Sequence, residues 1–169
     1  GDLSFINWET VVGNGCTQFG TAYSPGRSYA FVSRPENLTQ AHERGFNLIG
    51  MSNNHSRDCY ASNETSEHGE VASADMTAKS LAALGDMDWA TAGISASADR
   101  NDASRVSVHA FTIKGRTVRV ALGSLYLGRP DCPRAGCAGD TDALFRSFRA
   151  AQADLRILAL HSMGPTDQD

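Results

Sequence analysis

Hydrophobic positions along the first third of the chain follow strand spacing, then helical spacing, then strand spacing again. A brief apolar alternation at residues 2–6 predicts a strand, and the apolar side chains that follow Pro35 up to Gly45 have helical spacing. The apolar run at 46–51 comes next and predicts a buried strand. Between the first strand and the helix, residues 13–34 lack either period and predict a long surface loop.

The rest of the chain continues the alternation of helices and strands. It predicts a helix at 70–84, a strand at 87–92 and a hairpin of strands 106–113 and 117–125. A helix from Asp140 or Thr141 to Ala153 and a buried strand at 155–160 follow. The side chains of that helix expected to face inward are Leu144, Phe145, Phe148 and Ala151. Asp140 or Thr141 is expected to cap that last helix. This order predicts one layered α/β domain with helices outside and a mixed sheet inside.

Composition narrows the class of protein. A chain of 169 residues with 41% hydrophobic and 20% charged residues is typical of a soluble globular domain. The net charge of −4 leaves no broad basic surface, so nucleic acid is not expected as a partner. No apolar run approaches the ~18 residues that span a bilayer. Because the sequence opens directly on strand-like residues, we expect the natural protein to start earlier and any export signal to lie outside this chain.

Four cysteines indicate the redox compartment. Cys132 and Cys137 lie close together among Pro and Gly residues and predict one disulfide, and Cys16 with Cys59 would form the other. Disulfides imply an oxidising, extracytoplasmic location. The alternative is four free thiols in a cytosolic protein, because sequence alone does not fix connectivity.

Polar side chains of similar kinds follow three of the predicted strands. They are Asn7 and Glu9 after the first, Asn54, His55 and Asp58 after the second, and His161 after the last. If these strands are parallel neighbours, the side chains converge on one rim of the sheet, where open α/β sheets bind ligands. Carboxylate, amide oxygen and imidazole suit Zn, Mn, Fe or Mg, and two such ions ~3.5–4 Å apart can generate a hydroxide nucleophile. The alternatives are ordinary turn residues, a solvated Glu9 and a core His161.

The same segments carry a family resemblance. Residues Phe5-Ile-Asn7-Trp-Glu9, Gly45-Phe-Asn-Leu-Ile-Gly-Met-Ser-Asn53-Asn54-His55-Ser-Arg-Asp58, Thr77-x3-Leu81-x3-Gly85 and Ala153-Asp-Leu-Arg-Ile-Leu-Ala-Leu-His161-Ser-Met-Gly164 resemble the CapA family of poly-γ-glutamate capsule proteins. That family is similar in fold to calcineurin-type metallophosphoesterases, with Asn-Leu-Glu, Ala-Asn-Asn-His-x-x-Asp and His-Trp-Gly motifs in this order. The resemblance implies an α-β-β-α sandwich with mixed sheets.

Carried over residue by residue, the resemblance implies a metal-dependent site. Glu9, Asn54 and His161 would be ligands of two divalent metal ions, Mn, Zn or Fe, with Glu9 bridging or facing the metal. His55 would donate a proton or stabilise an oxyanion, and Asp58 would orient the His55 loop. Asn7, Asn53 and Arg57 are the candidate substrate-binding residues. The implied partners are an anionic polymer such as polyglutamate and membrane-anchored capsule machinery.

Departures from the family pattern leave two functions open. Trp8 stands where the family has Leu, Ser162-Met163 only partly matches its Trp-Gly spacing, and its opening Gly-Asp motif and later Gly-His-x-His motif have no counterpart. We therefore expect a domain that is incomplete at both termini. It is either a metal-dependent hydrolase of an amide or phosphoester, or a non-catalytic module that binds polyglutamate and scaffolds capsule assembly.

Overall fold

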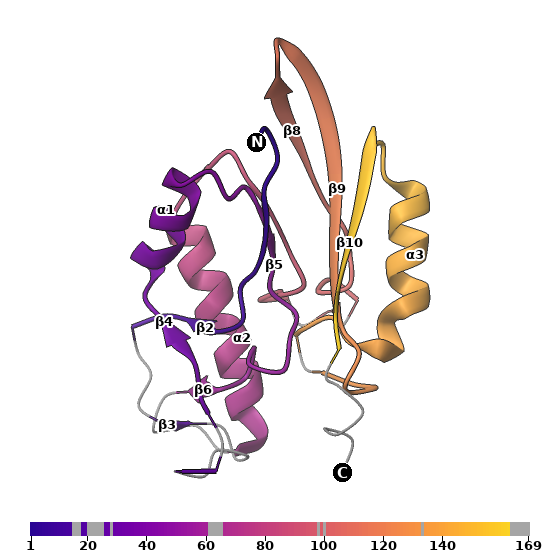
Figure 1. Ribbon diagram of the computed structural model, residues 1–169. Helices are drawn as coiled ribbons and strands as arrows, with labels where there is room; N and C mark the ends of the chain where they lie inside the picture. Colours follow the sequence, from indigo (N-terminus) through magenta and orange to yellow (C-terminus); the bar gives the residue numbers. More distant parts are fainter. Residues whose placement is uncertain are drawn as a thin grey trace.

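The computed structural model describes residues 1–14, 18–19, 26–27, 29–60, 66–97, 99, 101–132 and 134–162 (Figure 1). In chain order the elements are β1 (Phe5–Asn7), β2 (Val11–Val12), β3 (Gln18–Phe19), β4 (Val32–Ser33), α1 (Pro35–Glu43), β5 (Leu48–Gly50), β6 (Cys59–Tyr60), α2 (Ser66–Ala83), β7 (Ala90–Ala92), β8 (Ser107–Ile113), β9 (Arg116–Tyr126), the 3-10 turn η1 (Ala138–Asp140), α3 (Thr141–Ala150) and β10 (Leu155–His161).

A parallel sheet of β1, β5 and β7 is built by the first half of the chain, with β5 in the centre. Helix α1 leads into β5: Pro35 occupies its first turn, Leu38 is fully buried, and Gly45 adopts a φ of +92° just after the helix. Proline suits the first helical turn and glycine accepts positive φ, so the predicted helix boundaries are confirmed to within about two residues.

A mixed sheet is built by the second half, with β9 between β8 and β10. The predicted hairpin is confirmed: β8 and β9 are antiparallel and are joined by Lys114 and Gly115, whose φ values are +49° and +76°. Two consecutive residues with positive φ form the turn whose twist matches paired strands. Strand β10 runs parallel to β9.

The layers follow the order helix, sheet, sheet, helix (Figure 1). Leu38 of α1 packs with Ile49 of β5 on the outer side of the first sheet, together with partly buried Leu81 of α2. Phe111 and Leu122 of the second sheet pack against residues of the first sheet, which places an apolar core between the two sheets. Helix α3 covers the outer side of the second sheet through residues that include Leu144.

Several sequence predictions need correction. The α/β class is confirmed, but the order of elements predicted one mixed sheet, whereas the structure has two three-stranded sheets, the first parallel and the second mixed. Phe145 is 43% exposed and does not face inward, because Leu144 and Phe148 already define the buried face of α3. The helix ends at Ala150, and the Asp140 side chain accepts the Cys137 N–H at 3.0 Å instead of capping it.

The last strand and the second helix also differ from the prediction. Strand β10 is only partly buried, with Leu155 41% and Leu160 54% exposed, because within the described residues it pairs on one edge alone. Helix α2 begins at Ser66, four residues before the predicted start, and β4 lies within the predicted loop 13–34.

The local cysteine pair is confirmed. Cys132 and Cys137 form a disulfide, and their Cα atoms lie 5.7 Å apart, which is within the usual range for disulfides. Cys16 lies outside the described residues, so its pairing with Cys59 stays a prediction.

Candidate active site at the junction of two sheets

The polar residues that follow β1, β5 and β10 meet at one end of the molecule. Strands β1 and β5 are parallel neighbours, as the convergence argument requires. Strand β10 belongs to the second sheet, so His161 reaches the other residues across the junction of the two sheets and not along one rim. The convergence is therefore correct, although its predicted basis in a single sheet is wrong.

Asn7 lies at the centre of the hydrogen bonds that join the two sheets. Its side-chain nitrogen Nδ2 lies 3.1 Å from Glu9 Oε2 and 3.2 Å from His161 Nδ1, and its Oδ1 accepts from Asn53 at 3.4 Å. His161 Nε2 lies 2.7 Å from Asn54 Oδ1. Because an amide nitrogen only donates and an amide oxygen only accepts, these contacts place the proton of neutral His161 on Nε2.

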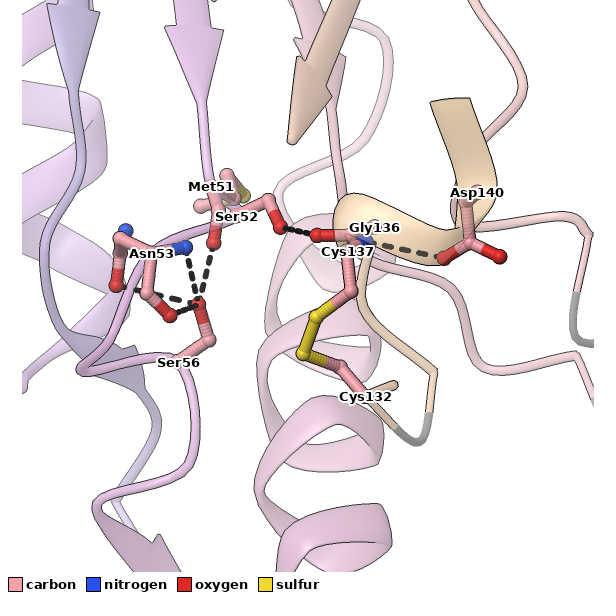
Figure 2. Close-up of a disulfide and its surroundings, with 8 residues drawn as sticks. All are labelled: Met51, Ser52, Asn53, Ser56, Cys132, Gly136, Cys137 and Asp140. Carbon is pink, nitrogen blue, oxygen red and sulfur yellow. Dashed lines mark hydrogen bonds between the residues drawn. A yellow bond between two sulfur atoms is a disulfide. The ribbon is translucent and has the colours of Figure 1, made fainter. Parts of the chain in front are cut away.

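Asn53 shapes the turn that presents Asn54 and His55. It is 2% exposed, its Nδ2 donates to the Trp8 carbonyl at 3.0 Å, and its Oδ1 accepts the His55 N–H at 3.0 Å. Ser56 Oγ closes the turn by donating to the Met51 carbonyl at 2.7 Å (Figure 2). These residues therefore do form a turn, as the alternative interpretation of the sequence predicted. The turn also orients the side chains of Asn54 and His55. Contact of Asn53 with a substrate stays a prediction.

His55 and Asp58 form a partly buried pair. His55 Nδ1 lies 2.6 Å from Asp58 Oδ2, and the two side chains are only 16% and 14% exposed. Asp58 Oδ2 also accepts the Phe31 N–H at 2.7 Å, and the Phe31 ring lies 4.4 Å from the His55 ring between centroids. A carboxylate on Nδ1 leaves the Nε2 of neutral His55 as a lone pair directed into the site.

Opposing effects act on the pKa of the Asp58 carboxyl. Burial raises the pKa of its carboxyl above the ordinary 3.8, against the opposing effects of the Phe31 N–H, of His55 and of the neighbouring Arg57 charge. Arg57 therefore acts on the pair through its charge, and contact of Arg57 with a substrate stays a prediction.

Glu9 faces both histidines. Its Oε1 lies 3.7 Å from His161 Nε2 and 3.9 Å from His55 Nε2, and its side chain is 38% exposed. Two ligands of one tetrahedral ion with bonds of about 2.0–2.2 Å lie ~3.4 Å apart, so these separations exceed that spacing by a few tenths of an ångström. Among the described residues, no group of three or more His, Cys, Asp or Glu side chains has the arrangement of a formed metal site. Asn54 would add an amide oxygen, a ligand type outside that group.

Two residues of this site were missed in the sequence. Phe31 holds Asp58 through its backbone and covers His55 with its ring, but it lies in a segment without regular spacing. Ser52 precedes the turn and is 1% exposed, with partners far along the chain. No local pattern marks either residue.

Comparison with known protein families identifies one that matches the whole chain. The model of the family described as bacterial capsule synthesis protein PGA_cap matches residues 1–169. The chain belongs to this family. The membership confirms the resemblance that rests on the Asn53–Asp58 motif and indicates a role in capsule synthesis. No curated protein matches the chain.

Membership of the PGA_cap family also suggests association with the cell surface. Within the part of the chain that the structure describes, no helix has the length and apolar character to cross a membrane.

Proposed function

We propose that this PGA_cap protein is a metal-dependent hydrolase that cleaves an amide or phosphoester in an anionic polymer of the poly-γ-glutamate type. The observation that carries the proposal is the His55–Asp58 pair, held at 2.6 Å with His55 Nε2 directed toward Glu9. The helix, sheet, sheet, helix order of layers supports a metallophosphoesterase-like fold, which carries its chemistry at such strand ends.

The donor set fits a divalent ion of the Mn, Zn or Fe type. Glu9, Asn54 and His161 would hold it, because their carboxylate, amide and imidazole groups approach one another and are hard to borderline ligands. Binding through Nε2 of His161 requires the proton that faces Asn54 to leave that nitrogen, because a ring nitrogen coordinates a metal through its lone pair. A bound ion of this type supplies a hydroxide nucleophile near neutral pH and polarises the scissile bond, and a second ion would need ligands beyond these three.

The residues of this chain have distinct tasks in the proposed reaction. Protonated on both ring nitrogens, His55 donates a proton from Nε2 to the leaving group, since that nitrogen is directed toward Glu9 and not toward Asp58. Asp58 keeps the ring oriented and stabilises its charged form. Asn7 fixes Glu9 and His161 relative to each other. The disulfide and the family membership support action on the extracytoplasmic side, beside membrane-anchored capsule machinery.

A second function, non-catalytic polyglutamate binding and scaffolding, is favoured by one observation. No formed cluster of three metal-ligating side chains is present among the described residues. Such a module would keep the fold and the family role while the polymer binds without being cleaved.

Metal content decides between the two functions. Plasma mass spectrometry after dialysis against trace Mn and Zn should find near-stoichiometric metal in the wild type and its loss in Glu9→Gln and His161→Ala. His109→Ala is the matched control, because His109 pairs with Asp88 at 2.8 Å outside the site. His55→Ala should keep the metal and lose cleavage of polyglutamate or of a phosphodiester probe. A wild type without metal contradicts the hydrolase and leaves the scaffold.

A further inference from the structure

The disulfide loop Cys132–Cys137 joins the ends of the two sheets beside the candidate active site. Ala135 pairs with Ile94, just after β7 of the first sheet, and Cys137 pairs with Tyr126 at the end of β9 in the second. Both cysteines and Ala135 are buried, with Cys132 and Ala135 3% exposed and Cys137 fully covered. One short covalently closed segment thus bridges both sheets at the end where the site residues converge.

Gly136 of this loop forms hydrogen bonds to residues at the ends of both sheets. Its N–H donates to the Gly93 carbonyl at 3.1 Å, and its own carbonyl accepts the Tyr126 N–H at 3.0 Å. The same carbonyl also accepts the Ser52 hydroxyl (Figure 2). A Cβ at position 136 would lie 2.6 Å from the Ser124 carbonyl oxygen. Only glycine lets the loop lie this close to the strands.

Ser52 connects this loop to the turn of the active site. It directly precedes Asn53, its N–H donates to Ser124 Oγ at 3.2 Å, and its hydroxyl donates to the Gly136 carbonyl. Both bonds cross from the first sheet to groups of the second sheet and of the loop. The position of the Asn53 turn is therefore set by the disulfide loop as well as by β5.

The other half of the site is held by the same part of the molecule. Tyr126 packs in one cluster with both cysteines, and its ring centroid lies 5.8 Å from that of His161. The next residue, Leu127, donates its N–H to the His161 carbonyl at 2.8 Å. The loop therefore contacts Ser52 directly and reaches His161 through Tyr126 and Leu127 at the end of β9.

We propose that the Cys132–Cys137 loop is a clamp that fixes the two halves of the site relative to each other, and that Ser52 is the positioning residue that links the clamp to the Asn53–His55 turn. The proposal concerns the geometry of the site and rests on the proposed function only where metal affinity is the readout. The resembled motif has alanine at this position, so Ser52→Ala is sterically acceptable. The Gly136 carbonyl keeps its bond from Tyr126 in that variant, and no buried acceptor is left without a partner.

The test measures the His161 ring directly in metal-free protein at fixed pH. ¹⁵N NMR should show wild-type His161 protonated on Nε2, between Asn7 and Asn54. Ser52→Ala should lower the ratio of this tautomer to the other roughly 3- to 10-fold, in the range of coupling between residues of one network. Ser80→Ala is the control, because its buried hydroxyl bonds Val12 and Met76 away from the site.

A double-mutant cycle tests the link to the disulfide. Cys132→Ala/Cys137→Ala should shift the His161 tautomer by a similar factor, and the triple variant with Ser52→Ala should shift it no further. Additive shifts, or an unchanged His161 in Ser52→Ala, would overturn the role of Ser52, and an unchanged His161 in the cysteine variant would overturn the clamp. If the cysteine variant does not fold, Gly136→Ala replaces it, because its Cβ would lie 2.6 Å from the Ser124 carbonyl oxygen and displace the loop.

Metal affinity separates this proposal from the proposed function. If the wild type binds Zn or Mn, Ser52→Ala should raise the Kd roughly 3- to 10-fold while Ser80→Ala leaves it unchanged. A wild type without metal contradicts the hydrolase, whereas the tautomer measurement still decides whether the clamp exists.

Discussion

Replacing Asp58 by Asn should reduce function far more than stability. The substitution keeps the size of a side chain that is 14% exposed and removes the charge that faces His55 Nδ1 at 2.6 Å and the Phe31 N–H at 2.7 Å. Both donors lie against the same oxygen, Asp58 Oδ2, so an asparagine with its amide oxygen in that place still accepts both bonds, but without the negative charge.

The magnitude follows from two opposing effects. A hydrogen bond to a charged group contributes ~1.5–3 kcal/mol, against ~0.5–1.5 kcal/mol for a neutral one, so the substitution weakens the pair. Burial raises the pKa of Asp58, which shows that the ionised carboxylate carries a desolvation cost, and the neutral amide does not. We therefore expect the free energy of unfolding to fall by only about 1 kcal/mol, or ~2–4 °C in Tm. Loss of the group that orients the proton-donating His55 should lower turnover ~10- to 100-fold, the range known for such orienting partners, while metal affinity is kept as in His55→Ala.

The assay compares Asp58→Asn with Asp88→Asn. Asp88 is a matched control, because it also pairs with a histidine, His109, at 2.8 Å but lies outside the site. Zn or Mn affinity by chelator competition, turnover of a phosphodiester or polyglutamate and Tm are measured for both. The reasoning would be refuted if both variants lost turnover equally, or if Asp58→Asn kept turnover within twofold of the wild type.

Three further predictions concern stability. Phe111→Ala empties the core between the sheets at a side chain that is 2% exposed and should cost ~3–5 kcal/mol in denaturant unfolding; a loss under 1 kcal/mol would contradict the described core. Gly93→Ala should cost ~2–4 kcal/mol, because its φ is +102° and its Cβ would lie 2.8 Å from Ser52, whereas Gly85→Ala, with φ +73° and open space, should cost ~1–2 kcal/mol; equal costs would contradict the close approach. A backbone N–H lowers the pKa of Asp99, so its stabilisation is present above pH 3.8 and is lost as the pH falls through the lower folded value; Asp99→Asn should flatten the stability profile there, and an unchanged profile would contradict the shift.

Elements with local signals were predictable from the sequence. The helix after Pro35 and the hairpin at Lys114 and Gly115 each depend on residues whose backbone preferences match the observed conformation. The turn of the Asn53–Asp58 motif was predictable for the same reason. Its hydrogen bonds join residues of the motif to one another and to Met51 just before it.

Long-range placement was not predictable in the same way. That His161 lies in a second sheet depends on the core around Phe111, which brings together residues far apart in the chain. The Ser52 hydroxyl bonds a carbonyl 84 residues away, and Phe31 reaches Asp58 from a segment without periodicity. Partial burial of β10 also depends on topology, since its apolar residues match a buried strand equally well.

The sign of the charges at the site bears on the choice between hydrolase and scaffold. Glu9 and Asp58 place two carboxylates beside the histidines, in a protein whose net charge is −4. Direct binding of a polyanion there would be opposed by like-charge repulsion, which a binding module would avoid by using arginine or lysine. A divalent ion reverses that logic, because it requires carboxylate ligands and then presents positive charge to the polymer. Glu9 and Asp58 therefore disfavour a scaffold that binds the polyanion directly. The same two residues have defined tasks in the proposed metal-dependent hydrolase.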